Sequence, residues 1–164
     1  MAPAATENVS GGESQVQTLR NILTSESEPL ARRFRALFSL KYLASLKPPT
    51  DQTVPAIEAI AAAFTSPSAL LKHELAYCLG QSRNDAAIQP LRTVLQDKAE
   101  DAMCRHEAAE ALGALGDKGS LHLLKELRDD KEEPDVVRET CDIAVDRIEW
   151  EYGRQREQEK LKQR

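Results

Sequence analysis

The chain has 164 residues, a formal net charge of −5 at pH 7 and a sequence pI near 5.3. This acidic balance argues against a general nucleic-acid binder, which would carry a basic patch or stripe. Hydrophobic residues make up 41% of the chain and aromatic residues only 4%, with alanine and leucine dominating the apolar set, a composition typical of close-packed helices.

The first residues, MAPAATENVSGGES, are small and polar, and we expect residues 1–14 to be disordered. They contain neither the basic region nor the apolar run of a signal peptide. No apolar stretch of the chain approaches the roughly 18 residues that span a bilayer. Three cysteines, Cys78, Cys104 and Cys141, show no CxxC spacing and are expected to be buried free thiols. These features predict a cytoplasmic protein with possible access to the nucleus and without a membrane partner.

A repeated two-residue step organises residues 15–152. LLKHELAYCLG contains His73-Glu74, and MCRHEAAEALG contains His106-Glu107, which follows 33 residues later. The same frame continues at Glu139-Thr140, another 33 residues on, and begins at Phe34-Arg35, 39 residues before His73. A basic residue precedes each step, and a leucine or valine follows at a fixed offset. These flanking positions are Arg33, Lys72, Arg105 and Arg138, and Leu40, Leu79, Leu112 and Val145.

The second unit shows two helices. The pattern TVPAIEAIAAAF predicts a first helix over 53–64, with Pro55 tolerated in its opening turn. The turn Ser66-Pro67-Ser68 then caps a second helix that is expected to end near Gly80. Apolar residues recur at spacings of three and four along this second helix, and no strand-like alternation is present.

The third unit repeats this arrangement. Asp85 is expected to cap a helix that reaches about residue 96, and a second helix spans about 101–115 before Gly116-Asp117 breaks it. Paired helices repeating about every 33 residues predict an all-α fold, an α-solenoid. The chain lacks the TPLH run of ankyrin repeats and the W…LG…Y pattern of tetratricopeptide repeats. The EALG ending of this unit is typical of HEAT-like helical-hairpin repeats, of which we expect about four.

The last part of the chain, EWEYGRQREQEKLKQR, is highly charged and has almost no apolar face. It is either an extension of the last helix that frays or the start of a linker. We assign 15–152 to the HEAT-like repeat domain and 153–164 to a charged tail or linker. Such charge runs are usually solvated segments rather than binding sites.

The two inner repeats alone carry a His-Glu step. A buried histidine or glutamate is costly unless it is paired or coordinated. Equivalent positions in adjacent repeats lie on parallel helices roughly 8–10 Å apart, so two imidazoles could reach one metal ion at about 2.0–2.1 Å each. Two histidines and a carboxylate form the donor set with which non-haem iron activates dioxygen. We therefore predict a metal site at His73, Glu74, His106 and Glu107, where Glu74 and Glu107 act as ligands, bridges or bases.

Other combinations of these residues are weaker. The steps are not HExxH, so a zinc-protease site lacks its second histidine. His106 and Glu110 are one helical turn apart and could chelate a metal, but Tyr77 replaces the acid in the neighbouring repeat. His122 is a lone histidine on an amphipathic segment and is expected at the surface.

The run LLKHELAYCLGQ, residues 70–81, closely resembles the deoxyhypusine hydroxylase family. RHEAAEALG at 105–113 is similar to the next repeat of that family, and the outer steps at 34–38 and 139–150 also look like it. The resemblance covers about residues 16–151. It implies an iron-dependent enzyme that hydroxylates the deoxyhypusine residue of a translation factor to give hypusine. It also implies two iron ions in a complete site, held here by His73, Glu74, His106 and Glu107.

The chain departs from this family in one respect. The family has two pseudo-symmetric halves with two His-Glu steps each, whereas this sequence contains only the first two steps. The resemblance therefore implies an N-terminal half with an incomplete di-iron site, either truncated or paired with a second half or a second copy; truncation is favoured. The alternative from another class is a non-catalytic HEAT-repeat interaction scaffold. A weaker third is a HEAT-like chromophore lyase, suggested only by the EALG endings.

Overall fold

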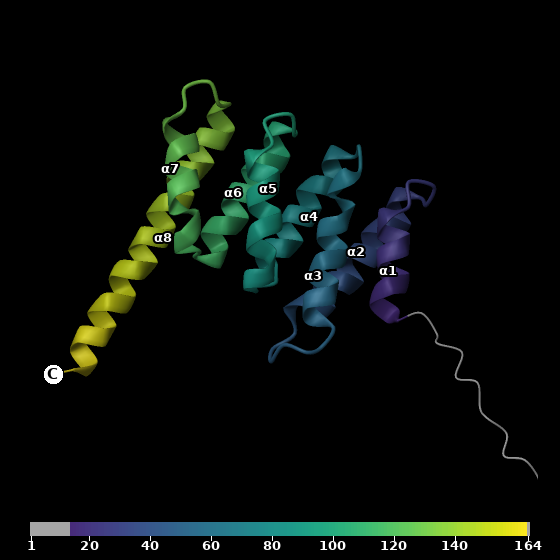
Figure 1. The fold of residues 1–164 in the computed structure, drawn as a ribbon, viewed down its shortest axis with the longest axis horizontal. Coiled ribbons are helices and arrows are strands. Elements are labelled where there is room, and N and C mark those ends of the chain that lie inside the picture. Colours follow the sequence, from purple (N-terminus) through teal and green to yellow (C-terminus); the bar gives the residue numbers. More distant parts are fainter. Residues whose placement is uncertain (1–13, 164) are drawn as a thin grey trace, which may run out of the picture.

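A computed structural model of the chain describes residues 14–163. Eight α-helices in this range form four hairpins that stand side by side, with the second helices of successive hairpins packed along the array (Figure 1). The described residues contain no strand, so the predicted all-α solenoid of about four HEAT-like hairpins is confirmed. The helices are α1 (Gln15–Thr24), α2 (Leu30–Ser45), α3 (Thr53–Ala61), α4 (Ala69–Gln81), α5 (Ile88–Gln96), α6 (Ala102–Leu115), α7 (Leu121–Asp129) and α8 (Asp135–Lys162).

The second hairpin follows the sequence pattern closely. The segment predicted as one helix over 53–64 is α3 followed by a 3-10 turn, η1 (Ala62–Thr65). Ser68 caps α4, its side chain accepting a hydrogen bond from the Leu71 amide at 3.2 Å. Such a cap satisfies one of the amides left free at a helix start. The predicted turn and the predicted second helix therefore both occur where expected.

The start of the third hairpin differs from the prediction. Asn84, rather than Asp85, caps the segment, because its side chain accepts a hydrogen bond from the Ala86 amide at 2.9 Å. Asp85 instead opens a 3-10 turn, η2 (Asp85–Ala87), and α5 begins only at Ile88. Asparagine and aspartate cap helices about equally well, so their order in the sequence could not distinguish them.

The two ends of α6 agree with the sequence. The Asp101 side chain accepts a hydrogen bond from the Met103 amide at 2.8 Å. Gly116 has φ +68°, a left-handed conformation that glycine adopts without strain and that ends the helix. A further 3-10 turn, η3 (Lys118–Ser120), leads into α7.

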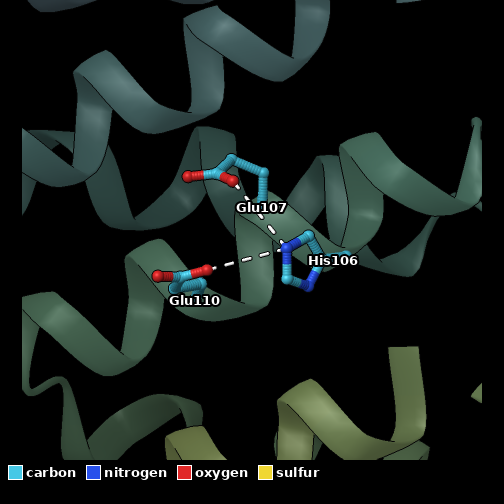
Figure 2. Close-up of side chains that lie close together, drawn as sticks. All are labelled: His106, Glu107 and Glu110. Carbon is cyan, nitrogen blue, oxygen red and sulfur yellow. Dashed lines mark ion pairs between the residues drawn. The ribbon is translucent and has the colours of Figure 1, made fainter. Parts of the chain in front are cut away.

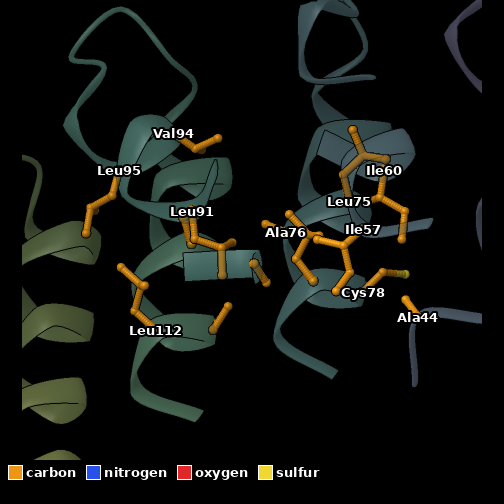
Figure 3. Close-up of a cluster of buried hydrophobic side chains, with 14 of the residues drawn as sticks. Ala44, Ile57, Ile60, Leu75, Ala76, Cys78, Leu91, Val94, Leu95 and Leu112 are labelled. Atoms are coloured by element: carbon orange, nitrogen blue, oxygen red, sulfur yellow. The ribbon is translucent and has the colours of Figure 1, made fainter. Parts of the chain in front are cut away.

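One continuous core of alanine, leucine and isoleucine fills the space between the two helices of each hairpin and between neighbouring hairpins (Figure 3). The predicted apolar position after each step is buried in all four repeats, and so are the three free cysteines. These residues are Leu40, Leu79, Leu112 and Val145, and Cys78, Cys104 and Cys141.

The basic residue before each step has a structural role in three of the four hairpins. Arg33, Arg105 and Arg138 each donate Nε–H to the backbone carbonyl ten residues earlier, at 2.8, 2.9 and 3.2 Å. Those carbonyls lie in the last turn of the first helix, where helical partners are missing. Lys72 instead forms an ion pair of 2.5 Å with Glu100 in the next hairpin. The basic positions therefore connect the second helix to the first helix of the same hairpin or, at Lys72, to the next hairpin.

The two ends of the chain differ in what can be said of them. Of the residues predicted to be disordered, 1–13 lie outside the described range, while Ser14 caps α1 by accepting a hydrogen bond from the Gln17 amide. The charged C-terminal segment continues α8 as a helix to Lys162, well beyond the repeat array (Figure 1). Among the described residues, no helix combines the length and the apolar character that crossing a membrane requires.

Candidate metal centre

The His-Glu steps lie where α4 and α6 approach each other closely. A Cβ added to Gly80 would stand 2.8 Å from Ala111 Cβ and 3.1 Å from Ala111 Cα. The same contact recurs one repeat later, where a Cβ on Gly113 would stand 3.0 Å from Ala144 Cβ. Such separations are too short for a side chain, so glycine lets the second helices approach. This approach lets side chains one turn or two away meet across the helix pair.

Two histidines from different repeats converge on one carboxylate. His73 Nε2 on α4 lies 3.0 Å from Glu107 Oε2 on α6, and His106 Nε2 lies 3.9 Å from the same oxygen. Glu107 is 7% exposed, whereas both histidines are half-buried. The group thus consists of the buried carboxylate of Glu107 and the half-buried imidazoles of His73 and His106, which lie at the surface of the α4–α6 pair.

Glu110 joins this group from the next turn of α6. Its Oε2 lies 3.6 Å from His106 Nε2, and Figure 2 shows the His106 ring facing both the Glu107 and the Glu110 carboxylates. One donor atom from each of these three residues lies within 4.8 Å of the other two. Glu110 is exposed, so it forms the outer rim of the group.

Glu74, the fourth residue predicted from the steps, is not brought into contact with the other three. It is half-buried on α4, and within residues 14–163 no hydrogen bond or ion pair joins it to His73, His106 or Glu107. The negative charge of Glu74 nevertheless affects the group, because it contributes to the raised pKa of Glu107. The structure therefore unites three of the four predicted ligands and adds Glu110.

The charge state of Glu107 reflects this crowded position. Burial raises the pKa of Glu107 above its ordinary value of 4.5, and the nearby charges of Glu110 and Glu74 raise it further. Positive charge on His73 or His106 lowers the same pKa. A buried carboxylate among other acids is costly, and a bound cation would offset that cost.

A cavity of about 210 Å³ lies beside His106, between α6 and α8. On its α8 side Thr140 Oγ1 lies 2.6 Å from His106 Nδ1, so both ring nitrogens of His106 face polar atoms. The cavity brings polar groups of the site and apolar groups of α8 together. Its lining residues are His106, Glu110, Gly113, Thr140, Ile143, Ala144 and Arg147.

His106, Glu107 and Glu110 supply the donor atoms of a possible metal-binding group, with His73 close to one of them. Ligands about 2.1 Å from one ion stand roughly 3 Å apart when they are adjacent in the coordination sphere. The 3.0 Å between His73 Nε2 and Glu107 Oε2 matches this separation, and the 3.9 Å between His106 Nε2 and the same oxygen is longer. Two imidazoles and a carboxylate from different helices are also the donors that non-haem iron prefers. The ligand roles of His73, Glu74, His106 and Glu107 remain a prediction.

The cysteines and the third histidine take no part in this centre. Burial raises the pKa of Cys78 and Cys141 to about 12 and that of Cys104 to about 11. These thiols therefore stay protonated near neutral pH and are poor nucleophiles. His122 is exposed on α7, as expected.

Two neighbours of the predicted ligands are not among the four residues predicted from the sequence. Glu110 is disfavoured by its counterpart Tyr77 in the previous repeat, yet its spacing of four from His106 places both on one helical face. Thr140 marks the end of the His-Glu pattern in the sequence. Its position 33 residues after Glu107 was the available signal, since that register places it beside the preceding histidine.

Residues 57–144 match the sequence profile of HEAT repeats. The chain is 79% identical over 150 residues to a deoxyhypusine hydroxylase of Phaeosphaeria nodorum, which covers 92% of this chain and 46% of that protein. It is 69% identical over 162 residues to the Aspergillus clavatus deoxyhypusine hydroxylase, covering 99% of this chain and 48% of that protein. The chain thus spans about half the length of the curated relatives it matches.

A solved structure shows the same likeness in three dimensions. The structure of human deoxyhypusine hydroxylase in complex with glycerol superposes with a TM-score of 0.73 and 47% sequence identity. The match covers 82% of this chain and 43% of that chain. The resemblance predicted from the run at 70–81 is therefore confirmed by both kinds of comparison.

Proposed function

Because the chain belongs to the HEAT-repeat family and matches deoxyhypusine hydroxylases over almost its whole length, we propose that it supplies one half of the iron centre of such an enzyme. His73, Glu74, His106 and Glu107 would hold the metal, with Glu74 and Glu107 also placed to accept a proton. Bound iron, two ions in a complete site, would activate dioxygen for hydroxylation of a carbon–hydrogen bond.

The convergence of His73 and His106 on Glu107 carries this proposal. A scaffold needs no buried acid without a lysine or arginine partner, and leaving Glu107 among other carboxylates costs stability unless a cation is bound. The two histidines approach the same carboxylate oxygen from separate repeats. That arrangement depends on both inner repeats being present, and Glu110 adds a further donor within 4.8 Å of the donors of His106 and Glu107.

The substrate would be the deoxyhypusine residue of a translation factor, converted to hypusine. This is a long modified lysine side chain that carries cationic amines. The exposed carboxylate of Glu110 at the rim, 61% exposed in its side chain, suits a cationic group arriving from solvent. The chain's own residues would orient that side chain and take up protons, while the metal supplies the oxidation.

The contact pattern supports an N-terminal half with an incomplete site. Each histidine reaches the second step residue of the following repeat, since His73 contacts Glu107 and His106 contacts Thr140. In the repeat before Glu74 the first step residue is Phe34, which has no donor atom. Glu74 therefore lacks a histidine from the preceding repeat and is open to a metal completed by another half or another copy of the chain. We propose the cytoplasm as the compartment, since three free cysteines fit a reducing environment.

The test is iron content together with solution mass. The chain is loaded with Fe²⁺ without oxygen, and iron per chain is measured alongside the mass in solution. About one iron per chain in a dimer would show that identical halves complete the site. A metal-free monomer would show that a second half is required. His73→Ala and His106→Ala should each lower iron content, whereas His122→Ala, at an exposed histidine outside the group, should not.

The second candidate is an interaction scaffold, favoured by large exposed apolar side chains at one repeat position. Phe38, Tyr77 and Ile143 are 48%, 40% and 69% exposed and share the register that holds Glu110 in the third repeat. If the chain acts only as a scaffold, His73→Ala and His106→Ala retain the partner. No iron then copurifies with the chain.

A further inference from the structure

Thr140 occupies an unusual place in the repeat register. It stands 33 residues after Glu107, at the position where the inner repeats carry the step glutamate. Its side chain reaches the histidine of the preceding repeat as Glu107 does: Thr140 Oγ1 lies 2.6 Å from Nδ1 of His106, and Glu107 Oε2 lies 3.0 Å from Nε2 of His73. Thr140 is 8% exposed, so this contact is largely shielded from water.

The hydrogen bonds of Thr140 determine where the proton of the His106 ring lies. A hydroxyl has one hydrogen to donate, and a carbonyl oxygen can only accept. Thr140 Oγ1 donates its hydrogen to the Val136 carbonyl oxygen on its own helix, at 2.6 Å. Oγ1 can therefore only accept at its contact with His106, so Nδ1 carries the proton and donates it.

With Nδ1 protonated, the neutral ring has its free lone pair on Nε2. Nε2 is the nitrogen that faces Glu107 at 3.9 Å and Glu110 at 3.6 Å. A metal bound within this group would need that lone pair. The protein interior thus presents the ring to the group in the one neutral form that can act as a ligand there.

We propose that Thr140 is a positioning residue that fixes the tautomer and the orientation of His106. The consequence for metal binding rests on the proposed function, whereas the consequence for the tautomer does not. Removing a residue that hydrogen-bonds to a metal-binding histidine commonly changes metal affinity by about 10- to 100-fold. Thr140 acts through His106 and need not touch metal or substrate itself.

The neighbouring histidine shows what Thr140 adds. His73 uses Nε2 to approach Glu107, and no hydrogen bond within residues 14–163 fixes its Nδ1 to a hydroxyl. The next step residue for His73 is Glu107 itself, which is a candidate ligand. At the end of the His-Glu series, Thr140 takes the place of the glutamate. Its hydroxyl donates to the Val136 carbonyl of its own helix and accepts a hydrogen bond from the last histidine, His106.

The experiment compares Thr140→Val, which keeps the shape but removes the acceptor, with Thr140→Ser, which restores it. Thr93→Val is the matched control, because Thr93 makes the same bond to a carbonyl four residues back on α5 and has no histidine partner. Nitrogen-15 NMR of the metal-free chain reports the protonated nitrogen of His106. Co²⁺ titration, with cobalt as a visible probe for Fe²⁺, reports metal affinity.

Wild type, Thr140→Ser and Thr93→Val should show His106 protonated at Nδ1 and bind Co²⁺ within about threefold of one another. Thr140→Val should shift the proton toward Nε2 and weaken Co²⁺ binding about 10-fold or more. An unchanged tautomer in Thr140→Val, or an unchanged affinity, overturns the proposal. If the wild-type chain binds no Co²⁺, this half does not bind metal by itself and requires a second half, and the tautomer comparison alone decides the role of Thr140.

Discussion

Two buried glutamates, Glu107 and Glu133, sit in opposite electrostatic surroundings. Glu133 lies before α8 with Arg105 Nη1 2.6 Å from its Oε2, and this ion pair lowers its pKa against the opposing effect of burial. Glu107 lies among two histidines and two further acids, and burial raises its pKa. The two residues are 7% and 4% exposed, so burial alone does not explain the difference.

Helix α6 joins these two regions. Arg105 and Glu107 are two positions apart on it, so they point to different sides of the helix. On one side the charges are paired within the protein, although Arg105 Nη2 has no hydrogen-bond partner among residues 14–163. Lys98 Nζ adds an approach of 3.2 Å to Glu133 Oε1 outside hydrogen-bonding geometry. On the other side, no lysine or arginine in the part of the chain that the structure describes forms an ion pair with Glu107, whose basic neighbours are His73 and His106. The comparison therefore distinguishes Glu133, whose charge stabilises the fold through its ion pair, from Glu107, whose charge is available to a ligand.

The largest effect is expected from Arg105→Met. Removing one member of a buried ion pair strands the other, so the free energy of unfolding should fall by about 3–5 kcal/mol in urea titrations. Arg138→Met is the matched control: Arg138 makes the equivalent bond to a carbonyl, but its acidic neighbour Asp135 is 88% exposed. The free energy of unfolding of Arg138→Met should fall by much less. Equal losses in both variants would contradict the structural role assigned to the buried pair.

Glu107→Gln should separate binding from stability. We expect Fe²⁺ or Co²⁺ affinity to fall by about 100-fold or more, since a candidate ligand is removed. The midpoint of thermal unfolding of the metal-free chain should stay within about 2 °C or rise, because a neutral amide costs less to bury among acids. A large fall in stability would show that Glu107 is a structural charge like Glu133, and it would contradict the difference drawn between the two residues.

Gly80→Ala tests whether the site face depends on helix approach. The added Cβ would meet Ala111 at 2.8 Å, and overpacking of this kind costs about 1–3 kcal/mol. Because α4 must move away from α6, metal affinity should fall as well. Gly153→Ala is the control, since a Cβ there meets nothing within 4 Å on the exposed part of α8. It should stabilise slightly, by up to about 1 kcal/mol; unchanged metal affinity in Gly80→Ala would argue against the geometric link.

The smallest effect concerns acid stability. The lowered pKa of Glu133 means that its contribution is fully present above its ordinary value of 4.5 and is lost as the pH falls through the folded-state pKa. Wild type should therefore lose stability more steeply below pH 4.5 than Glu133→Gln, measured by urea unfolding at a series of pH values. Glu132→Gln, at the exposed neighbour, should follow wild type. Parallel curves for wild type and Glu133→Gln would show that the Arg105–Glu133 ion pair does not contribute to the loss of stability in acid.

Much of the fold followed from local pattern. The cap in the Ser66-Pro67-Ser68 turn, the start of a helix near Asp101 and the break at Gly116 could be predicted, because each depends on residues within a few positions of one another. The 33-residue register could be predicted because the same motif recurs along the chain. The shift of the third cap to Asn84 was not readable, since two equivalent capping residues stand side by side. The six extra residues of the first interval were visible, but not that α2 extends to Ser45 before the longer connection to α3.

The sequence by itself determined that the inner repeats repeat a His-Glu step and that the steps face one another. Only the tertiary structure decided that both histidines converge on Glu107 while Glu74 stays apart, and that Thr140 bonds to His106. Repeat spacing specifies which residues share a face, but contact depends on how closely the helices approach. Here that approach is set by Gly80 and Gly113 against the alanines of the next repeat, a long-range fit that no local pattern encodes.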